Sequence, residues 1–167
     1  METAYIALGA NIPGPAGSPR ETLEAAIQRL GQLGTLVSRS RLYETAPVGY
    51  ADQPAFLNAA ASVETTLEPE AILECMLAIE LSFGRDRTHG IPNGPRSLDL
   101  DLLLYGDRIV KTQNLEIPHP RMAQRAFVLV PLMEIASGLI HPQFRKSMKQ
   151  LLQDLEAHEK DFIHGGR

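Results

Sequence analysis

Two aspartates stand inside a leucine-rich run, RSLDLDLLLYGD, at residues 96–107. If this run is a β-strand, Asp99 and Asp101 share one face, because alternate residues of a strand do, and the leucines between them face the core. Two like charges so close repel each other, and aspartate is a poor strand former. A divalent cation would offset the repulsion, and carboxylate oxygens suit Mg²⁺, which completes its shell with water and phosphate oxygens. The pair therefore predicts a Mg²⁺ site; the alternative is a half-exposed strand whose outward residues happen to be acidic.

Arginines gather next to this pair. Arg96 precedes Asp99 by three residues, and Arg85 and Arg87 lie in the Gly/Pro-rich segment just before it. A guanidinium group binds phosphate oxygens in a bidentate manner, and a metal ion can bridge phosphates from the other side. Carboxylates and arginines at one strand end therefore indicate phosphoryl transfer, although solvated surface arginines are the simpler alternative. The chain has no GxxxxGK[ST] motif, so a P-loop enzyme is not expected.

Composition narrows the class of protein. A length of 167 residues fits a single domain, expected to span 1–167, with room for one core. A formal net charge of −4 argues against a nucleic-acid-binding protein. The single cysteine rules out an intrachain disulfide and fits a reducing, cytoplasmic setting. The longest apolar stretch, residues 126–136, is too short to cross a bilayer, so no membrane partner is expected.

The hydrophobic pattern predicts the elements that must position these residues. Strands are expected at 3–10, 35–45, 55–67 and 97–105, with helices after Ser18 and from Pro69. Ser18 begins a capping box, SPRE, and two further helices are expected from about Ala126 and after Ser147. The order β-α-β-β-α-β predicts an α/β (α+β) ferredoxin-like sandwich, in which helices pack on an antiparallel-rich sheet, followed by C-terminal helices.

Six segments of the sequence, in order, also resemble a known family. They read AYIALGAN, YETAPVG, QPAFLNAA, IELSFGRDR, NGPRSLDLDLLLYGD and IPHPRMAQRAFVLVPL. Over roughly residues 3 to 140 the chain resembles the 6-hydroxymethyl-7,8-dihydropterin pyrophosphokinases of folate biosynthesis. The resemblance implies a ferredoxin-like fold and an ATP- and Mg²⁺-dependent enzyme. Such an enzyme transfers the pyrophosphoryl group of ATP to the hydroxymethyl group of the pterin and releases AMP.

The same resemblance implies roles for individual residues. Asp99 and Asp101 match the ligands of two Mg²⁺ ions, and Arg85 and Arg96 match catalytic arginines that act on the phosphates. The positions that match ATP contacts are Glu80, Arg87, Arg96, Leu102, His119 and Arg125. The positions that match pterin contacts are Thr45, Ala46, Val48, Phe56, Asn58 and Phe127. Alternatives stay open for several: Glu80 at a solvated helix end, His119 as an ordinary turn histidine, and the two phenylalanines as plain core.

The pterin residues also make chemical sense by themselves. A flat heterocycle fits between two aromatic rings, such as Phe56 and Phe127. Asn58 follows Phe56 by two residues on the same strand face, and its amide both donates and accepts hydrogen bonds, as a pterin edge requires. The chain departs from some relatives in the loop before GPR, where Asn93 replaces a tryptophan and the loop looks one residue longer.

Two rival functions remain at this point. One keeps the chemistry and changes the acceptor to another pterin-like alcohol. The other is a non-catalytic ferredoxin-like module that binds a small ligand or RNA, but an RNA-binding sheet should carry exposed aromatics and a basic face. The expected partners are ATP and the hydroxymethyl pterin, with no nucleic acid and no membrane, and the chain is expected to act as a monomer.

Overall fold

The computed structural model describes residues 1–45, 53–85 and 94–162, except for the side chains of residues 158–162. Five strands form an antiparallel sheet in the order β2-β4-β1-β5, and β3 also pairs with β4. The strands are β1 (Glu2–Ala10), β2 (Thr35–Arg39), β3 (Tyr43–Thr45), β4 (Phe56–Thr65) and β5 (Asp99–Tyr105). The helices are α1 (Pro19–Arg29), α2 (Pro69–Ser82), α3 (Ala126–Ala136) and α4 (Met148–Phe162), with short 3₁₀ turns at Leu30–Gln32 and Met122–Gln124.

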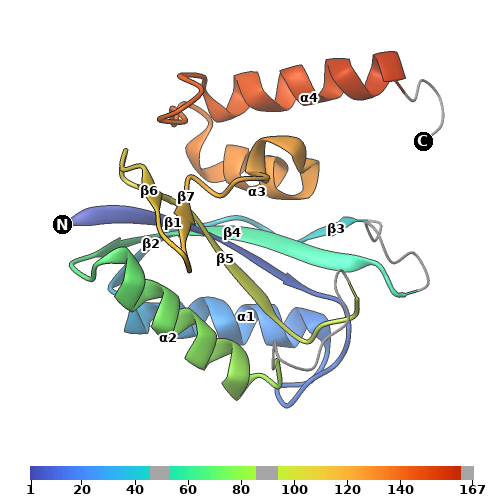
Figure 1. Ribbon diagram of the computed structural model, residues 1–167. Helices are drawn as coiled ribbons and strands as arrows, with labels where there is room; N and C mark the ends of the chain where they lie inside the picture. Colours follow the sequence, from blue (N-terminus) through green and yellow to red (C-terminus); the bar gives the residue numbers. More distant parts are fainter. Residues whose placement is uncertain (46–52, 86–93, 163–167) are drawn as a thin grey trace.

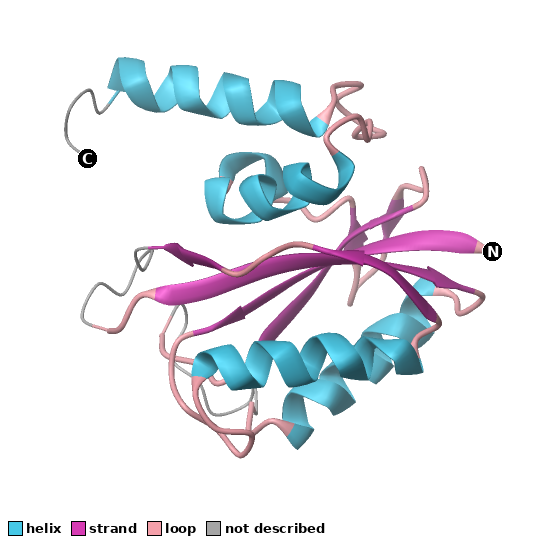
Figure 2. Cartoon of the chain, turned by 180° about the vertical axis from the view of Figure 1, so that it is seen from behind, coloured by secondary structure: helices cyan, strands magenta, loops and turns pink. Residues whose placement is uncertain are grey.

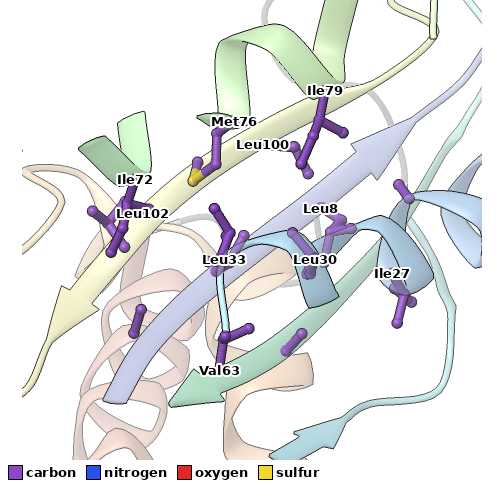
Figure 3. Packing of buried hydrophobic residues seen from close by; sticks show 14 of the residues in the cluster. Leu8, Ile27, Leu30, Leu33, Val63, Ile72, Met76, Ile79, Leu100 and Leu102 are labelled. Carbon is purple, nitrogen blue, oxygen red and sulfur yellow. The ribbon is translucent and has the colours of Figure 1, made fainter. Parts of the chain in front are cut away.

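The sheet is covered on both faces. α1 and α2 lie on one face, and α3 and α4 lie on the other (Figures 1 and 2). Figure 3 shows the larger cluster of buried side chains, in which leucines of β1 and β5 meet apolar residues of α1 and α2. A second buried cluster fills the space between the sheet and α3 and α4. The predicted ferredoxin-like sandwich with additional C-terminal helices is therefore confirmed.

Local signals start the first two helices where the sequence predicts. The Glu21 backbone N–H donates to Ser18 Oγ at 3.2 Å, and the Ser18 N–H donates to Glu21 Oε1 at 2.9 Å, so both halves of the capping box are formed. Pro69 occupies the first turn of α2, where its missing N–H leaves no hydrogen bond unmade. None of the helices in the described part of the chain is long and apolar enough to span a membrane.

The predicted strand at 35–45 is wrong as one continuous element, because β2 and β3 are separate. Ser40 lies between them and takes over the pairing with β4: its N–H donates to the Ala60 carbonyl at 2.8 Å, and its Oγ accepts from the Ala60 N–H at 2.9 Å. The same hydroxyl donates to the Arg41 carbonyl at 2.7 Å. The chain therefore bends at Ser40, and β3 pairs with the opposite end of β4.

The segment after β5 contains a hairpin that the pattern did not predict. β6 (Val110–Lys111) pairs with β7 (Glu116–Ile117), and two-residue strands are too short to show alternation. Next to it, the register between β1 and β5 shifts: Ile6 pairs with Leu102 and Tyr5 with Leu104, so Leu103 is an additional, bulged residue. The Leu103 carbonyl accepts a hydrogen bond from the His119 N–H at 2.9 Å, which fastens the segment after β7 to β5.

Candidate active site

An open pocket lies between the α3 face of the sheet and the start of α3. It has a volume of about 680 Å³, including the space at its mouth. Four strands and one helix supply its walls. The lining residues are Ala7, Leu8 and Gly9 of β1, Thr45 of β3, Phe56 and Asn58 of β4, Arg96, Asp99 and Asp101 at β5, and Arg125, Phe127 and Val128 at α3.

The two aspartates share one face of β5, as the alternation predicts. Asp99 pairs with Gly9 and Asp101 with Ala7 across the β1 ladder, and both carboxylates line the pocket. Their leucine neighbours point to the opposite face and are buried against α1 and α2. In the described part of the chain, no cluster of three or more histidine, cysteine or acidic side chains forms a metal site. Two hard oxygen donors that face one pocket suit a Mg²⁺ ion that takes its other ligands from water and phosphate.

Each carboxylate lies near a nitrogen-bearing side chain. Asp99 Oδ2 accepts from Arg96 Nη1 at 2.9 Å, and both side chains are less than one-fifth exposed. Asp101 Oδ1 lies 3.8 Å from His119 Nε2. The His119 Nδ1 accepts from the Arg121 N–H at 3.2 Å, so Nε2 is the nitrogen that carries the proton facing Asp101. His119 is therefore oriented toward the aspartate pair rather than outward from a turn.

The two phenylalanines of the pocket each hold an arginine over the ring. The Arg96 guanidinium carbon lies 5.5 Å from the centre of the Phe56 ring, and that of Arg125 lies 5.6 Å from the centre of the Phe127 ring. Arg96 Nε also donates to the Gly94 carbonyl at 3.1 Å. Cation–π contacts of this kind hold both positive charges at the pocket, and that of Arg96 is also paired with Asp99. The pocket thus combines flat apolar surfaces with cationic groups.

The amide of Asn58 supplies a polar contact on the β4 wall. Its Nδ2 donates to Thr45 Oγ1 at 2.6 Å, and the residue is 7% exposed. Gly9 lies beside it on β1: a methyl group built on Gly9 would come within 3.1 Å of Asn58 Oδ1. The absence of a side chain at Gly9 therefore leaves room for the Asn58 amide.

Comparison with known protein families identifies the family to which the chain belongs. The model of the family 7,8-dihydro-6-hydroxymethylpterin-pyrophosphokinase (HPPK) matches residues 5–137. The chain belongs to the HPPK family. The chain is similar to the 2-amino-4-hydroxy-6-hydroxymethyldihydropteridine pyrophosphokinase of Haemophilus influenzae, with 46% identity over 85% of this chain and 86% of that protein. The protein of the same name from Bacillus subtilis is 47% identical over 79% of this chain and 77% of that protein.

The fold agrees with solved HPPK structures. The crystal structure of Plasmodium falciparum HPPK-DHPS wild type matches 98% of this chain with a TM-score of 0.75. Sequence identity in that match is 16%, so the likeness concerns the fold alone. This chain spans 46% of the Plasmodium chain. The resemblance to the HPPK family that the sequence motifs indicate is confirmed by the family match and by the Haemophilus and Bacillus relatives.

The structure brings eight of the predicted site residues to the pocket walls. They are Thr45, Phe56, Asn58, Arg96, Asp99, Asp101, Arg125 and Phe127. His119 joins them through Asp101. Ala46, Val48, Arg87 and Asn93 lie outside the described residues. The contacts that the HPPK resemblance implies for all of these positions remain predictions.

Three predicted residues lie away from the pocket walls. Glu80 is 1% exposed, and its Oε2 accepts from the Leu100 N–H at 2.7 Å, so the solvated helix end considered from the sequence is wrong. Leu102 belongs to the core cluster on the α1 and α2 face, which leaves only its backbone for a contact with ATP. Arg85 follows α2, and its buried Nε makes no hydrogen bond within the described part of the chain.

Asn11 is a residue of the site region that the sequence reasoning missed. Its Oδ1 accepts from the Arg96 N–H at 2.9 Å, and its own N–H donates to the Arg96 carbonyl at 3.0 Å. Its Nδ2 donates to Gln53 Oε1 at 2.8 Å and to the Pro54 carbonyl at 3.0 Å. Asn11 therefore ties the segment before β5 to the segment before β4. Its place at the end of a buried strand, in the motif AYIALGAN, was the available signal.

Proposed function

We propose that this chain transfers the pyrophosphoryl group of ATP to 6-hydroxymethyl-7,8-dihydropterin, a step of folate biosynthesis, and releases AMP. The observation that supports it most is one pocket, in a chain of the HPPK family, that joins two carboxylates to two arginines and two aromatic rings. In the reaction, the pterin hydroxymethyl oxygen forms a bond to the β-phosphorus and its hydroxyl proton is released to solvent. The bond from that phosphorus to the oxygen that bridges it to the α-phosphorus breaks, and AMP leaves with that oxygen.

Asp99 and Asp101 would hold two Mg²⁺ ions in this proposal. When bound, the ions stabilise charge on the attacking and leaving oxygens of a displacement at phosphorus. Without a cation, the two carboxylates repel the triphosphate, so the chain should bind ATP weakly. The 2.9 Å contact of Arg96 with Asp99 keeps one carboxylate oriented toward the pocket.

The cationic side chains would bind the phosphates. Arg96 and Arg125 line the pocket and keep their charges over aromatic rings. His119 lies beside Asp101, near enough to donate to a phosphate oxygen next to the metal ligands. Arg85 and Arg87 complete the proposed set, with Glu80 and the Leu102 backbone on the ATP side. Because Asp99 and Asp101 are the only acidic residues among the described pocket walls, positioning and charge neutralisation should supply most of the rate.

The pterin would enter between Phe56 and Phe127. Both rings line the pocket, and Asn58 lies on the same wall as Phe56. The Asn58 Nδ2 already donates to Thr45, which orients the amide so that its oxygen can accept from the ligand. Ala46 and Val48 belong to the proposed pterin contacts as well. The enzyme is proposed to act as a monomeric cytoplasmic protein, with residues 1–167 as one catalytic domain.

Calorimetric titration with ATP separates this proposal from a non-catalytic binding module. The protein is titrated in Mg²⁺ and, as the control, in EDTA. The proposal predicts binding that is weakened at least about tenfold without Mg²⁺, because the metal offsets the repulsion between carboxylates and phosphates. Equal affinity in both solutions would contradict the roles of Asp99 and Asp101.

A further inference from the structure

The strand β3 is a weakly supported part of the pocket wall. It has three residues and pairs with β4 through Tyr43–Asn58, Glu44–Leu57 and Thr45–Phe56. Two of these pairs hold proposed pterin contacts, because Asn58, Phe56 and Thr45 all line the pocket. A strand of three residues forms few hydrogen bonds with its neighbour. The position of β3 therefore depends on contacts outside the sheet.

Glu134 of α3 makes those contacts. Its Oε1 accepts from the Tyr43 hydroxyl at 2.5 Å, and the Arg41 backbone N–H lies 3.3 Å from both of its oxygens. The Glu134 side chain is 29% exposed, whereas that of Arg41 is 76% exposed. The ion pair between them, at 3.4 Å, therefore adds little, and the hydrogen bonds from Tyr43 and from the backbone carry the contact.

These hydrogen bonds also hold Glu134 in its charged form. They lower the pKa of the Glu134 carboxyl, with the Tyr43 hydroxyl as the largest cause, while burial acts in the opposite direction. The same contact raises the pKa of Tyr43, so its hydroxyl keeps the proton that it donates. At neutral pH the pair is thus a charge-assisted hydrogen bond, stronger than one between neutral groups.

The placement of Glu134 on α3 connects this contact to the pocket. Phe127 lies seven residues before Glu134, so the two share one side of the helix, about 10 Å apart along its axis. Tyr43 and Thr45 are alternate residues of β3 and share one face, about 7 Å apart. α3 lies over β4 (Figure 1). Thr45 in turn accepts from Asn58 Nδ2 at 2.6 Å.

We propose that Glu134 is a positioning residue for the pterin pocket: by binding Tyr43 and the Arg41 N–H, it fixes the distance between β3 and α3. That distance sets the width of the pterin pocket: Asn58 and Thr45 form one wall, and Phe127 forms the other. The inference rests on the proposed function, because it takes these residues as the pterin contacts.

The effect should fall mainly on the pterin. Asp99, Asp101 and Arg96 belong to β5 and the segment before it, which β1 separates from β4 and β3. A shift of β3 against α3 therefore leaves the proposed metal ligands in place. Arg125, a proposed phosphate contact, lies at the opposite end of α3 from Glu134. Loss of Glu134 should therefore raise the KM for the pterin well beyond any change in the KM for ATP, a separation that a general loss of stability would not produce.

The test compares four proteins by steady-state AMP formation: wild type, Glu134→Ala, Glu134→Gln and, as the matched control, Glu24→Ala. Glu24 also joins a helix to a strand, because it accepts from Arg39 of β2 at 2.6 and 3.2 Å, but it belongs to α1, which lies on the other face of the sheet (Figure 1). Thermal unfolding of all four proteins shows whether each variant is folded. A milder variant, Tyr43→Phe, is assayed in the same way, so that the test remains valid if Glu134→Ala folds poorly.

We expect Glu134→Ala to raise the pterin KM about tenfold and Tyr43→Phe about threefold, with the ATP KM within about twofold of wild type. Glu134→Gln should stay within about threefold, because its amide oxygen still accepts both hydrogen bonds. Glu24→Ala should leave both KM values unchanged. An active wild type with an unchanged pterin KM in Glu134→Ala, or with both KM values raised equally, would overturn the inference alone. A wild type that forms no pterin-dependent AMP would overturn the proposed function and this inference with it.

Discussion

Replacing Gly9 by alanine should weaken pterin binding and leave ATP binding unchanged. Gly9 lies on β1 between Asn58 of β4 and Asp99 of β5, with which it pairs on either side. A methyl group there would lie 3.1 Å from Asn58 Oδ1 and 3.7 Å from the Leu57 carbonyl oxygen. The first distance is tighter than an ordinary van der Waals contact, so the amide of Asn58 must shift by a few tenths of an ångström.

The cost of that movement follows from what holds the amide. Asn58 is 7% exposed and donates to Thr45 at 2.6 Å, so a rotation loses this hydrogen bond or leaves the side chain away from its preferred rotamer. The hydrogen bond contributes about 1 kcal/mol. A displaced rotamer instead costs about 1 kcal/mol. Either change therefore costs about 1 kcal/mol, which corresponds to about a fivefold rise in the pterin KM.

Steady-state kinetics with each substrate varied in turn measures this effect. Gly31→Ala is the control, because a methyl group at Gly31 would have no heavy atom within 4 Å. The Tm of Gly9→Ala should stay within about 4 °C of wild type, since alanine also reduces the entropy of the unfolded chain. A pterin KM equal to that of wild type, or a parallel rise in the ATP KM, would refute the assignment of Asn58 to the pterin.

Three further predictions test other parts of the site. Alanine at Asp99 or at Asp101 should lower kcat in Mg²⁺ by at least about a hundredfold, because each removes a proposed metal ligand; near-native turnover of either variant would exclude the metal assignment. Phe127→Ala should raise the pterin Kd more than the ATP Kd, as measured by calorimetry, because a stacking surface is lost; equal changes in both would count against the aromatic sandwich. The folded-state pKa of Glu134 is lowered by Tyr43, so its contribution to stability is present above the unfolded pKa and is lost as pH falls through the folded pKa. The Tm difference between wild type and Glu134→Gln should therefore be larger at pH 7 than at about pH 3, and a difference independent of pH would contradict the charged state of this group.

The fold was predictable where local signals determine it. The period-two alternation around Asp99 and Asp101 gives the strand and the shared face of the carboxylates. The capping box at Ser18 gives the start of α1. The break between β2 and β3 was not predictable in this way, because Ser40 pairs with Ala60, a contact between residues 20 positions apart.

The candidate site was predictable only in part, for a similar reason. Residues that belong to a motif, such as Arg96 and Asn58, could be assigned through the HPPK resemblance. Asn11 and Glu134 act through hydrogen bonds to residues that are distant in sequence: Gln53 lies 42 positions from Asn11, and Arg41 lies 93 positions from Glu134. The burial of Glu80 was also not predictable from local sequence. Its position near a helix end suggests exposure, whereas its carboxylate accepts a hydrogen bond from the Leu100 N–H, 20 positions away.

The nucleotide product of a complete reaction tests the central claim most directly. The protein is incubated with ATP, Mg²⁺ and 6-hydroxymethyl-7,8-dihydropterin, and the nucleotides are separated by chromatography, with omission of pterin and omission of Mg²⁺ as controls. The proposed function predicts AMP that forms only when pterin and Mg²⁺ are both present. ADP as the pterin-dependent product, or no pterin-dependent product at all, would contradict it.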